Sequence, residues 1–323
     1  MMRERKIPTL MNDQLMSFYA QCDENGISNR DKIRLHQKVI RRVASTDKSK
    51  SYESMLGESD GIVEADGKLI GFGIHILNED IYPLQSFEIY LRNCDLTGEL
   101  DLSDQPELLF VDIYHNRISE ILVDGAVKLR ILGVQDNWID RLDVSGLTAC
   151  QGIDAGMNRL TELDVSHNAE LVELYINDNQ ISRINLRGCP KLKYFYCHNN
   201  PIQELDTRAN PMLRHLNATG CPMKHILSLA PQREETLPLE LTAGEGGSVG
   251  LKFNPVYNAQ WKETGEWQQS YYAYPHEGFR FCGWYDTNGL LLSTEETWLD
   301  AYGSSRVLRA IFEAVYLWHC PRN

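Results

Sequence analysis

Residues 171–181 read LVELYINDNQI and residues 192–202 read LKYFYCHNNPI. Both stretches place apolar residues at their first, fourth and sixth positions, an Asn at the ninth and an Ile at the eleventh, and they begin 21 residues apart. The same frame recurs at this period. Further copies begin at Leu108, Leu129, Cys150 and Leu213, and a looser copy around Ile89 precedes them at a spacing of 22. The period predicts stacked repeats, because a unit this short cannot bury its apolar face alone.

Each repeat divides into positions that point inward and positions that point outward. Alternation of the apolar pair with polar residues predicts a short strand with one buried face. The Asn column is expected where the chain turns inward, with each amide satisfying backbone groups of its own and adjacent turns. This column comprises Asn116, Asn137, Asn158, Asn179 and Asn200. We interpret the column as structural, and Cys94 and Cys221 replace its Asn in the first and last units.

The frame L-x-x-L-x-L-x-x-N-x-L resembles the leucine-rich-repeat signature, and it covers residues 86–231 with about seven units. The resemblance implies a repeat solenoid that is mostly β. A second strand is expected in each repeat, with inward pairs from Ile121/Val123 to Leu205/Thr207. An outward column beside it alternates in charge: Glu120, Arg141, Glu162, Arg183, Glu204 and His225. We expect these side chains to pair laterally between repeats and fix their register.

The outward residues of the first strand are the candidates for binding, because in horseshoe and arc-shaped solenoids this strand lines the concave side. The candidate residues are Phe110, Asp112, Tyr114, His115, Asp154, Glu173, Tyr175, Tyr194, Tyr196, His198 and His215. Bulky residues gather at both ends, and Gly133, Gly152 and Gly156 lie between them. We expect a groove with a glycine floor that binds a protein or peptide, with a glycan as the weaker option.

Composition narrows the classes of partner. The net charge is −13, from 32 Lys and Arg against 45 Asp and Glu, which argues against non-specific nucleic-acid binding. No stretch approaches the roughly 20 apolar residues of a membrane span, and the first twenty residues lack a signal-peptide core. We therefore expect a cytoplasmic chain or one exported by a non-standard route, with eight cysteines that stay reduced.

The sequence predicts no catalytic residue, metal site or cofactor. Cys197 and His198 are neighbours, but strand alternation points them to opposite faces. Metal-binding motifs are missing, and the glycine cluster at 244–250 lacks the Lys of a phosphate loop. The alternative that stays open is an enzyme whose site lies in the flanks, around His276, Asp286 or residues 45–60.

The flanking regions differ from the repeats. Residues 1–85 are expected to form an α+β cap, with a helix from Asp31 to Ala44 and a hairpin around Asp66–Gly67. Residues 232–323 alternate as strands and are expected to form a small β domain.

This C-terminal region resembles the divergent internalin B-repeat, a β-grasp-like module. The residues that carry the likeness are Leu-Thr-Ala at 241–243, Gly-Phe-x-Phe-x-Gly-Trp at 278–284 and a closing Ala-Ile-Phe-Glu. With the repeats, the chain resembles leucine-rich proteins of Bacteroidales and Listeria internalins. That resemblance implies a bacterial adhesin or host-protein binder at the cell surface. An intracellular inhibitor or immunity-type binder is the alternative.

Overall fold

The computed structural model describes residues 17–32 except 19, 62–65, 68–72, 87–230 except 104 and 107, 237–300 except 259 and 261, and 307–315. Their regular secondary structure is almost wholly β. They fall into two compact units, Met1–Leu171 and Val172–Asn323, here called unit 1 and unit 2. Among the described residues, no helix has the length and apolar character that crossing a membrane requires.

Unit 1 begins with two short elements of the predicted N-terminal region. Strands β1 (Ile62–Ala65) and β2 (Lys68–Phe72) pair antiparallel, which confirms the expected hairpin. Residues 29–32 are helical, while residues 33–44 of the predicted helix lie outside the described residues. The boundaries at 85/86 and 231/232 stay predictions.

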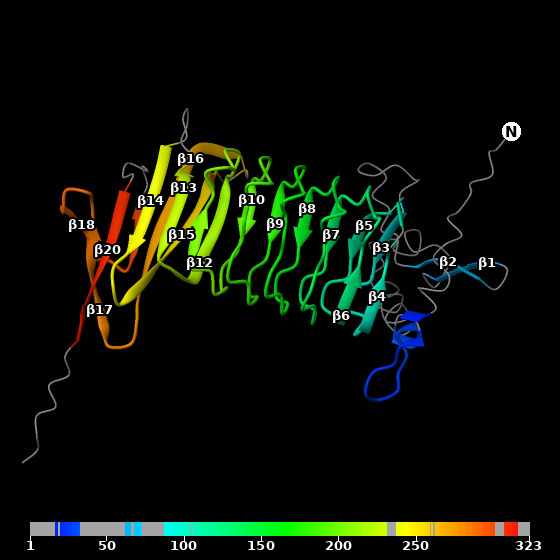
Figure 1. Cartoon of the computed structure of the whole chain (residues 1–323). Coiled ribbons are helices and arrows are strands. Elements are labelled where there is room, and N and C mark those ends of the chain that lie inside the picture. Colours follow the sequence, from blue (N-terminus) through cyan, green and yellow to red (C-terminus); the bar gives the residue numbers. More distant parts are fainter. Residues whose placement is uncertain are drawn as a thin grey trace, which may run out of the picture. The chain divides into compact units, whose positions relative to one another are not determined.

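The repeats of unit 1 stack as a parallel sheet in which every strand lies one repeat after its neighbour (Figure 1). The register pairs Val111 with Leu132 and Leu132 with Ile153, so the 21-residue period is also the register of the sheet. Its strands are β3 (Phe87–Tyr90), β5 (Leu108–Asp112), β7 (Ile131–Gly133) and β8 (Gly152–Asp154). A second parallel pair is formed by β4 (Thr97–Asp101) and β6 (Arg117–Leu122).

In unit 2 the repeat strands continue into the C-terminal region as one sheet (Figure 1). Its repeat strands are β9 (Glu173–Tyr175), β10 (Tyr194–Tyr196) and β12 (His215–Met223). Strand β15 (Gly247–Tyr257) then pairs antiparallel with β12, followed by β16 (Glu263–Pro275) and β19 (Thr297–Asp300).

A six-stranded sheet completes unit 2. In spatial order its strands are β11 (Glu204–Asp206), β13 (His225–Ala230), β14 (Leu237–Ala243), β20 (Val307–Ala314), β17 (Phe279–Tyr285) and β18 (Leu291–Ser293). Tyr271 of β16 and Trp284 of β17 are fully buried with ring centroids 5.9 Å apart, so the two sheets share a core. The alternation predicted at Leu241 and Leu251 is confirmed, since both are buried there.

The Asn column is structural, as predicted. The Asn158 amide donates to the carbonyls of Val134 at 3.0 Å and Ala155 at 3.2 Å, and its oxygen accepts from Ile139 N at 3.1 Å. Asn116, Asn137 and Asn200 repeat this pattern. Each side chain thus joins one rung, meaning one 21-residue repeat, to the next.

A second buried Asn column was not predicted. Asn168 donates to the carbonyls of Val144 at 2.9 Å and Leu147 at 3.0 Å, and Asn210 does the same two rungs later. The intervening rung holds Cys189 at this position, and the rung before Asn168 holds Leu147. The side-chain oxygens of both Asn are buried without a hydrogen-bond partner.

The expected second strand of each repeat is confirmed only in part. It forms in β6, β11 and β13, whereas residues 138–144, 159–165 and 180–186 form no strand. Their inward residues Val144, Val165 and Leu186 are nevertheless buried. Burial of the apolar positions is therefore satisfied without a continuous hydrogen-bonded ladder.

The prediction of lateral charge pairs is wrong. Within unit 1 the described Glu120 and Arg141 form no ion pair, and the same is true of Arg183 and Glu204 within unit 2. His225 instead contacts Glu240 of β14 at 2.9 Å. These long exposed side chains gain little from pairing in water, which explains why the alternating signs do not bring them together.

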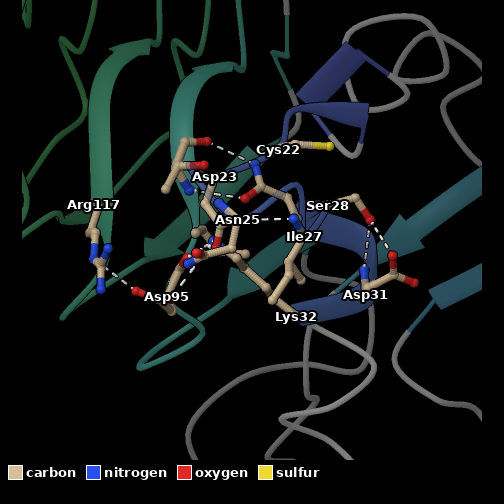
Figure 2. Close-up of polar contacts among 12 residues, drawn as sticks. Cys22, Asp23, Asn25, Ile27, Ser28, Asp31, Lys32, Asp95 and Arg117 are labelled. Atoms are coloured by element: carbon tan, nitrogen blue, oxygen red, sulfur yellow. Dashed lines mark hydrogen bonds and ion pairs between the residues drawn. The ribbon is translucent and has the colours of Figure 1, made fainter.

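The segment 17–32 contacts β4 through side-chain amides. Gln21 exchanges two 2.8 Å hydrogen bonds with the backbone of Glu99, and Asn29 bonds both backbone groups of Thr97. Figure 2 shows the adjoining polar cluster, in which Lys32 contacts Asp23 at 3.0 Å. Gly98 is required here, because its φ is +87° and a Cβ would lie 1.6 Å from Oε1 of Gln21.

Candidate functional site

Three outward tyrosines lie on two adjacent rungs of unit 2. Leu174 of β9 and Phe195 of β10 are buried, which turns the residues on either side of them outward, and Leu216 of β12 is buried at the same position. The register aligns Tyr194 with Glu173 and His215, and Tyr196 with Tyr175. The outward placement predicted from alternation is confirmed for Glu173, Tyr175, Tyr194 and Tyr196, but it is wrong for His215, which is buried.

The aromatic rings contact one another across the rungs. Tyr175 and Tyr196 have centroids 5.1 Å apart, and Tyr194 stacks on the imidazole of His215 at 4.4 Å with an angle of 17°. The ring of His198 meets the edge of Tyr196 at 6.3 Å. These contacts form two groups, Tyr175–Tyr196–His198 and Tyr194–His215, and we call the five residues together the tyrosine face. Only His215 is nearly covered, at 8% exposure.

The C-terminal strands extend this face, which the sequence did not reveal. Strand β15 pairs with β12 so that Lys252 lies opposite Asn217. The hydroxyl of Tyr257, at the end of β15, lies 3.5 Å from Nε2 of His215. Farther along the sheet, Tyr274 accepts a hydrogen bond from Gly220 N at 3.1 Å. No sequence signal specified which strand β15 would join.

Burial sets the charge of the two histidines. It lowers the pKa of His198, and Lys252 lowers that pKa further while Asp178 opposes the effect. Burial also lowers the pKa of His215. Both imidazoles are therefore neutral at neutral pH. Burial, together with Tyr194, raises the pKa of the Tyr196 phenol. The tyrosine face thus presents neutral aromatic surface with phenol hydroxyl groups for hydrogen bonding.

The outward face of unit 1 differs from the prediction, because its glycines do not form an open floor. Tyr114 lies over Gly133, where an added Cβ would come within 2.7 Å of the ring. Its hydroxyl donates to Asp154 at 2.8 Å, two rungs from its own strand. Gly152 and Gly156 are also buried. Glycine permits the chain's own tyrosine to lie flat, and so the space expected for a partner is filled.

Asp112 is not accessible to a partner. It is 1% exposed and forms an ion pair with Arg92, whose guanidinium lies 4.9 Å from the Tyr114 ring centroid. Burial raises the pKa of Asp154, despite the hydrogen bond from Tyr114. Burial and the Asp154 carboxylate also raise the pKa of Tyr114. The cluster is an internal network, which removes Asp112 from the set of surface contacts.

The remaining candidates of this unit lie apart from that network or at its border. Phe110 is half-buried on β5. His115 is exposed on the turn after β5, has a left-handed φ of 55° and pairs with Asp136. Among the predicted candidates of unit 1, Tyr114 and Asp154 are brought together, while His115 belongs to the turn.

The described side chains do not form the arrangement that the catalytic alternatives require. Cys197 is fully buried, which raises the pKa of its thiol well above the ordinary value, and His198 lies on the surface side of the strand. Asp286 accepts hydrogen bonds from Asn288 N and Leu290 N and so forms a turn. Residues 45–60 lie outside the described residues. Within the ranges given above, no three His, Cys, Asp or Glu side chains are grouped as metal ligands would be.

Comparison with known proteins agrees with the repeat geometry. Residues 169–210, which include β9 and β10, match the family model for leucine-rich repeats in two copies. The two repeats within this range are leucine-rich repeats, and the other repeats share their frame. No curated protein sequence matches the chain.

Several solved structures of bacterial proteins are similar at low identity. A leucine-rich-repeat protein of Leptospira interrogans is 20% identical with a TM-score of 0.29, over 31% of this chain and 27% of that one. An internalin (inlF) of Listeria monocytogenes is 20% identical with a TM-score of 0.32, over 40% and 41%. The functional domain of InlJ from Listeria monocytogenes, which includes a cysteine ladder, is 16% identical with a TM-score of 0.31, over 70% and 66%. The chain therefore spans less than two thirds of the length of the first two.

Proposed function

We propose that this chain is a non-enzymatic scaffold that binds a protein or peptide through the tyrosine face. The observation that carries the proposal is the placement of Tyr175, Tyr194 and Tyr196 on adjacent rungs, half-buried and in contact with neighbouring rings. Tyrosine is a favoured residue of binding hot spots, because it buries a large area at a small cost in side-chain entropy. Leucine-rich-repeat solenoids present such surfaces to protein partners.

Strand pairing and ring stacking hold the tyrosine face in place. Each strand is hydrogen-bonded to its neighbours, and the Tyr194 ring is held by stacking on His215. Binding therefore requires little ordering of this surface, which favours affinity. Glu173, Asn217 and Lys252 surround the rings with groups that can hydrogen-bond a peptide backbone.

The test is to select binders on the wild-type chain and measure their affinity for the variant Y175A/Y196A. Truncating one hot-spot residue costs about 2 kcal/mol or more, which lowers affinity about 30-fold, so the double variant should lose at least this much. The matched control R183A/E204A alters two exposed side chains of the column that alternates in charge, and it should bind like wild type. Equal affinity for wild type and Y175A/Y196A, with both folded, would exclude the tyrosine face.

The same variants can separate the biological alternatives. An adhesin should capture host extracellular proteins, whereas an inhibitor or immunity-type protein should capture one from lysate of its own cells. In either case capture must be lost in Y175A/Y196A and kept in the control. Binding of an oligosaccharide alone, with no protein partner, would favour the glycan option instead.

A further inference from the structure

A three-rung stack of exposed side chains lies on unit 1, outside the tyrosine face. The guanidinium of Arg159 lies 4.9 Å from the ring centroid of Trp138, and that of Arg117 lies 5.8 Å from it. The three residues occupy the same position of consecutive repeats, directly after Asn116, Asn137 and Asn158. We call them the Arg-Trp-Arg stack.

The backbone fixes this stack on the solenoid. Arg117 N donates to Leu96 O at 2.7 Å, Trp138 N to Ile118 O at 2.9 Å and Arg159 N to Ile139 O at 2.9 Å. Each residue is therefore tied to the rung before it. The Asn column beside these bonds holds the same turns, because Asn137 accepts from Ile118 N and Asn158 accepts from Ile139 N. The two arginines and the indole are presented at a fixed spacing.

The repeat itself does not require these residue types. In unit 2 the same position holds Gln180, Pro201 and Pro222. Trp138 is 45% exposed, whereas Trp284 is fully buried. Such exposure is unusual for tryptophan, which is highly buried on average. The stack is thus a local feature of three rungs rather than a consequence of solenoid packing.

The stack offers hydrogen-bond donors and no acceptors. Arg117 pairs with Asp95 at 2.9 Å, but in the described part of the chain Arg159 has neither an ion pair nor a side-chain hydrogen bond. The indole N–H of Trp138 likewise has no partner there. A guanidinium held flat on an aromatic ring keeps its edge free to bind a carboxylate with two parallel bonds.

The neighbouring residues restrict the kind of anion. Asp140 and Glu162 are exposed on the same rungs and would repel a polyanion. A single carboxylate would instead contact only Arg159. Met157, two residues before Arg159, is 44% exposed and adds apolar surface. Trp, Arg and Met are the residue types enriched where proteins meet. We propose that the Arg-Trp-Arg stack is a second interaction surface, which binds an acidic peptide segment that places an apolar side chain beside its carboxylate.

The experiment uses the full chain carrying Y175A/Y196A, so that the tyrosine face cannot supply the binding. A random-peptide display library is panned on it at low salt, and selected peptides are measured by fluorescence anisotropy. We expect enrichment of Asp or Glu next to an apolar residue. Affinity should fall about tenfold or more when R159A or W138A is added. R159K should bind weakly too, because an ammonium cannot form the planar fork.

The matched control is R141A, which removes an exposed arginine from the same rung as Trp138 but outside the stack. It should leave peptide affinity unchanged. Three results would overturn the proposal: peptides with no acidic enrichment, equal losses in R141A and R159A, or R159-dependent binding of heparin in place of peptide. None of these bears on the tyrosine face, which is tested separately.

Discussion

Replacement of Asn158 by Ala should destabilise unit 1 more than any exposed substitution. The side chain bridges three segments through its amide and its oxygen, and it is only 9% exposed. Removal leaves Ile139 N without the acceptor that it has at 3.1 Å in the native structure, whereas Val134 O keeps a donor in the Asn137 amide at 3.0 Å. A buried backbone group left unpaired costs about 1–3 kcal/mol. One such group predicts a loss of about 1–3 kcal/mol in the free energy of unfolding.

Asn168 provides the contrast, because it is fully buried but only donates. Both acceptors have a second donor: Val144 O accepts from Leu147 N at 3.0 Å, and Leu147 O accepts from Cys150 N at 3.1 Å. Asn168→Leu therefore leaves no carbonyl unpaired and removes a buried oxygen that lacks a partner. The rung before it already holds Leu147 at this position. We expect a change within about 1 kcal/mol of zero.

Equilibrium unfolding in urea, followed by circular dichroism, measures both variants against wild type. Hydrogen exchange at the amide of Ile139 supplies a local readout, since its protection depends on the Asn158 oxygen. The reasoning would be refuted if N158A lost less than about 1 kcal/mol, or if N168L lost as much as N158A. The first result would mean that water replaces the side chain. The second would mean that the volume of the Asn, rather than its bonding pattern, stabilises the turn.

Two further predictions concern the turns. Met157 has a left-handed φ of 53°, and Asn199 occupies the same position in another rung. Because Asn adopts this conformation more readily, M157N should raise stability by about 0.5–1 kcal/mol. A lower thermal midpoint would contradict this. Backbone amides of Ser145 and Ser166 lower the pKa of the Asp143 and Asp164 carboxyls, so their contribution is present above about pH 4 and is lost as pH falls through the folded-state values. D143N/D164N keeps an accepting oxygen that does not titrate, and its thermal midpoint should decline less steeply on acidification than that of wild type. Parallel declines would show that these turns do not control acid stability.

The repeat and its outward columns could be predicted because they depend on local periodicity. A frame that returns every 21 residues fixes which side chains enter the core, and Leu174, Phe195 and Leu216 lie where it places them. The function of Asn158 followed from the same frame, because a turn repeated at a fixed period offers the same backbone groups each time. The second Asn column escaped notice because it recurs only every 42 residues, at Asn168 and Asn210.

The rest depends on contacts that periodicity does not specify. Tyr114 could have pointed to solvent, but the missing Cβ at Gly133 lets it lie flat and reach Asp154. Strand β15 could have paired elsewhere, and its choice of β12 adds Lys252 and Tyr257 to the surroundings of the tyrosine face. Each outcome results from a competition between alternative packings of side chains or strands, and a single sequence does not rank them.

The two proposed surfaces share a property that distinguishes them from the rest of the solenoid. Inward positions keep nearly the same residue type from rung to rung, because every rung must fill the same volume and bond the same backbone groups. Outward positions have no such requirement. The column of the stack reads Arg117, Trp138, Arg159 and then Gln180, while the column of the tyrosine face reads Gly133, Asp154, Tyr175 and Tyr196. Large aromatic side chains left partly exposed at positions that the fold does not constrain are costly unless they contact something. The places where the outward columns depart from uniformity are therefore where binding should be sought, and in this chain they are two separate places.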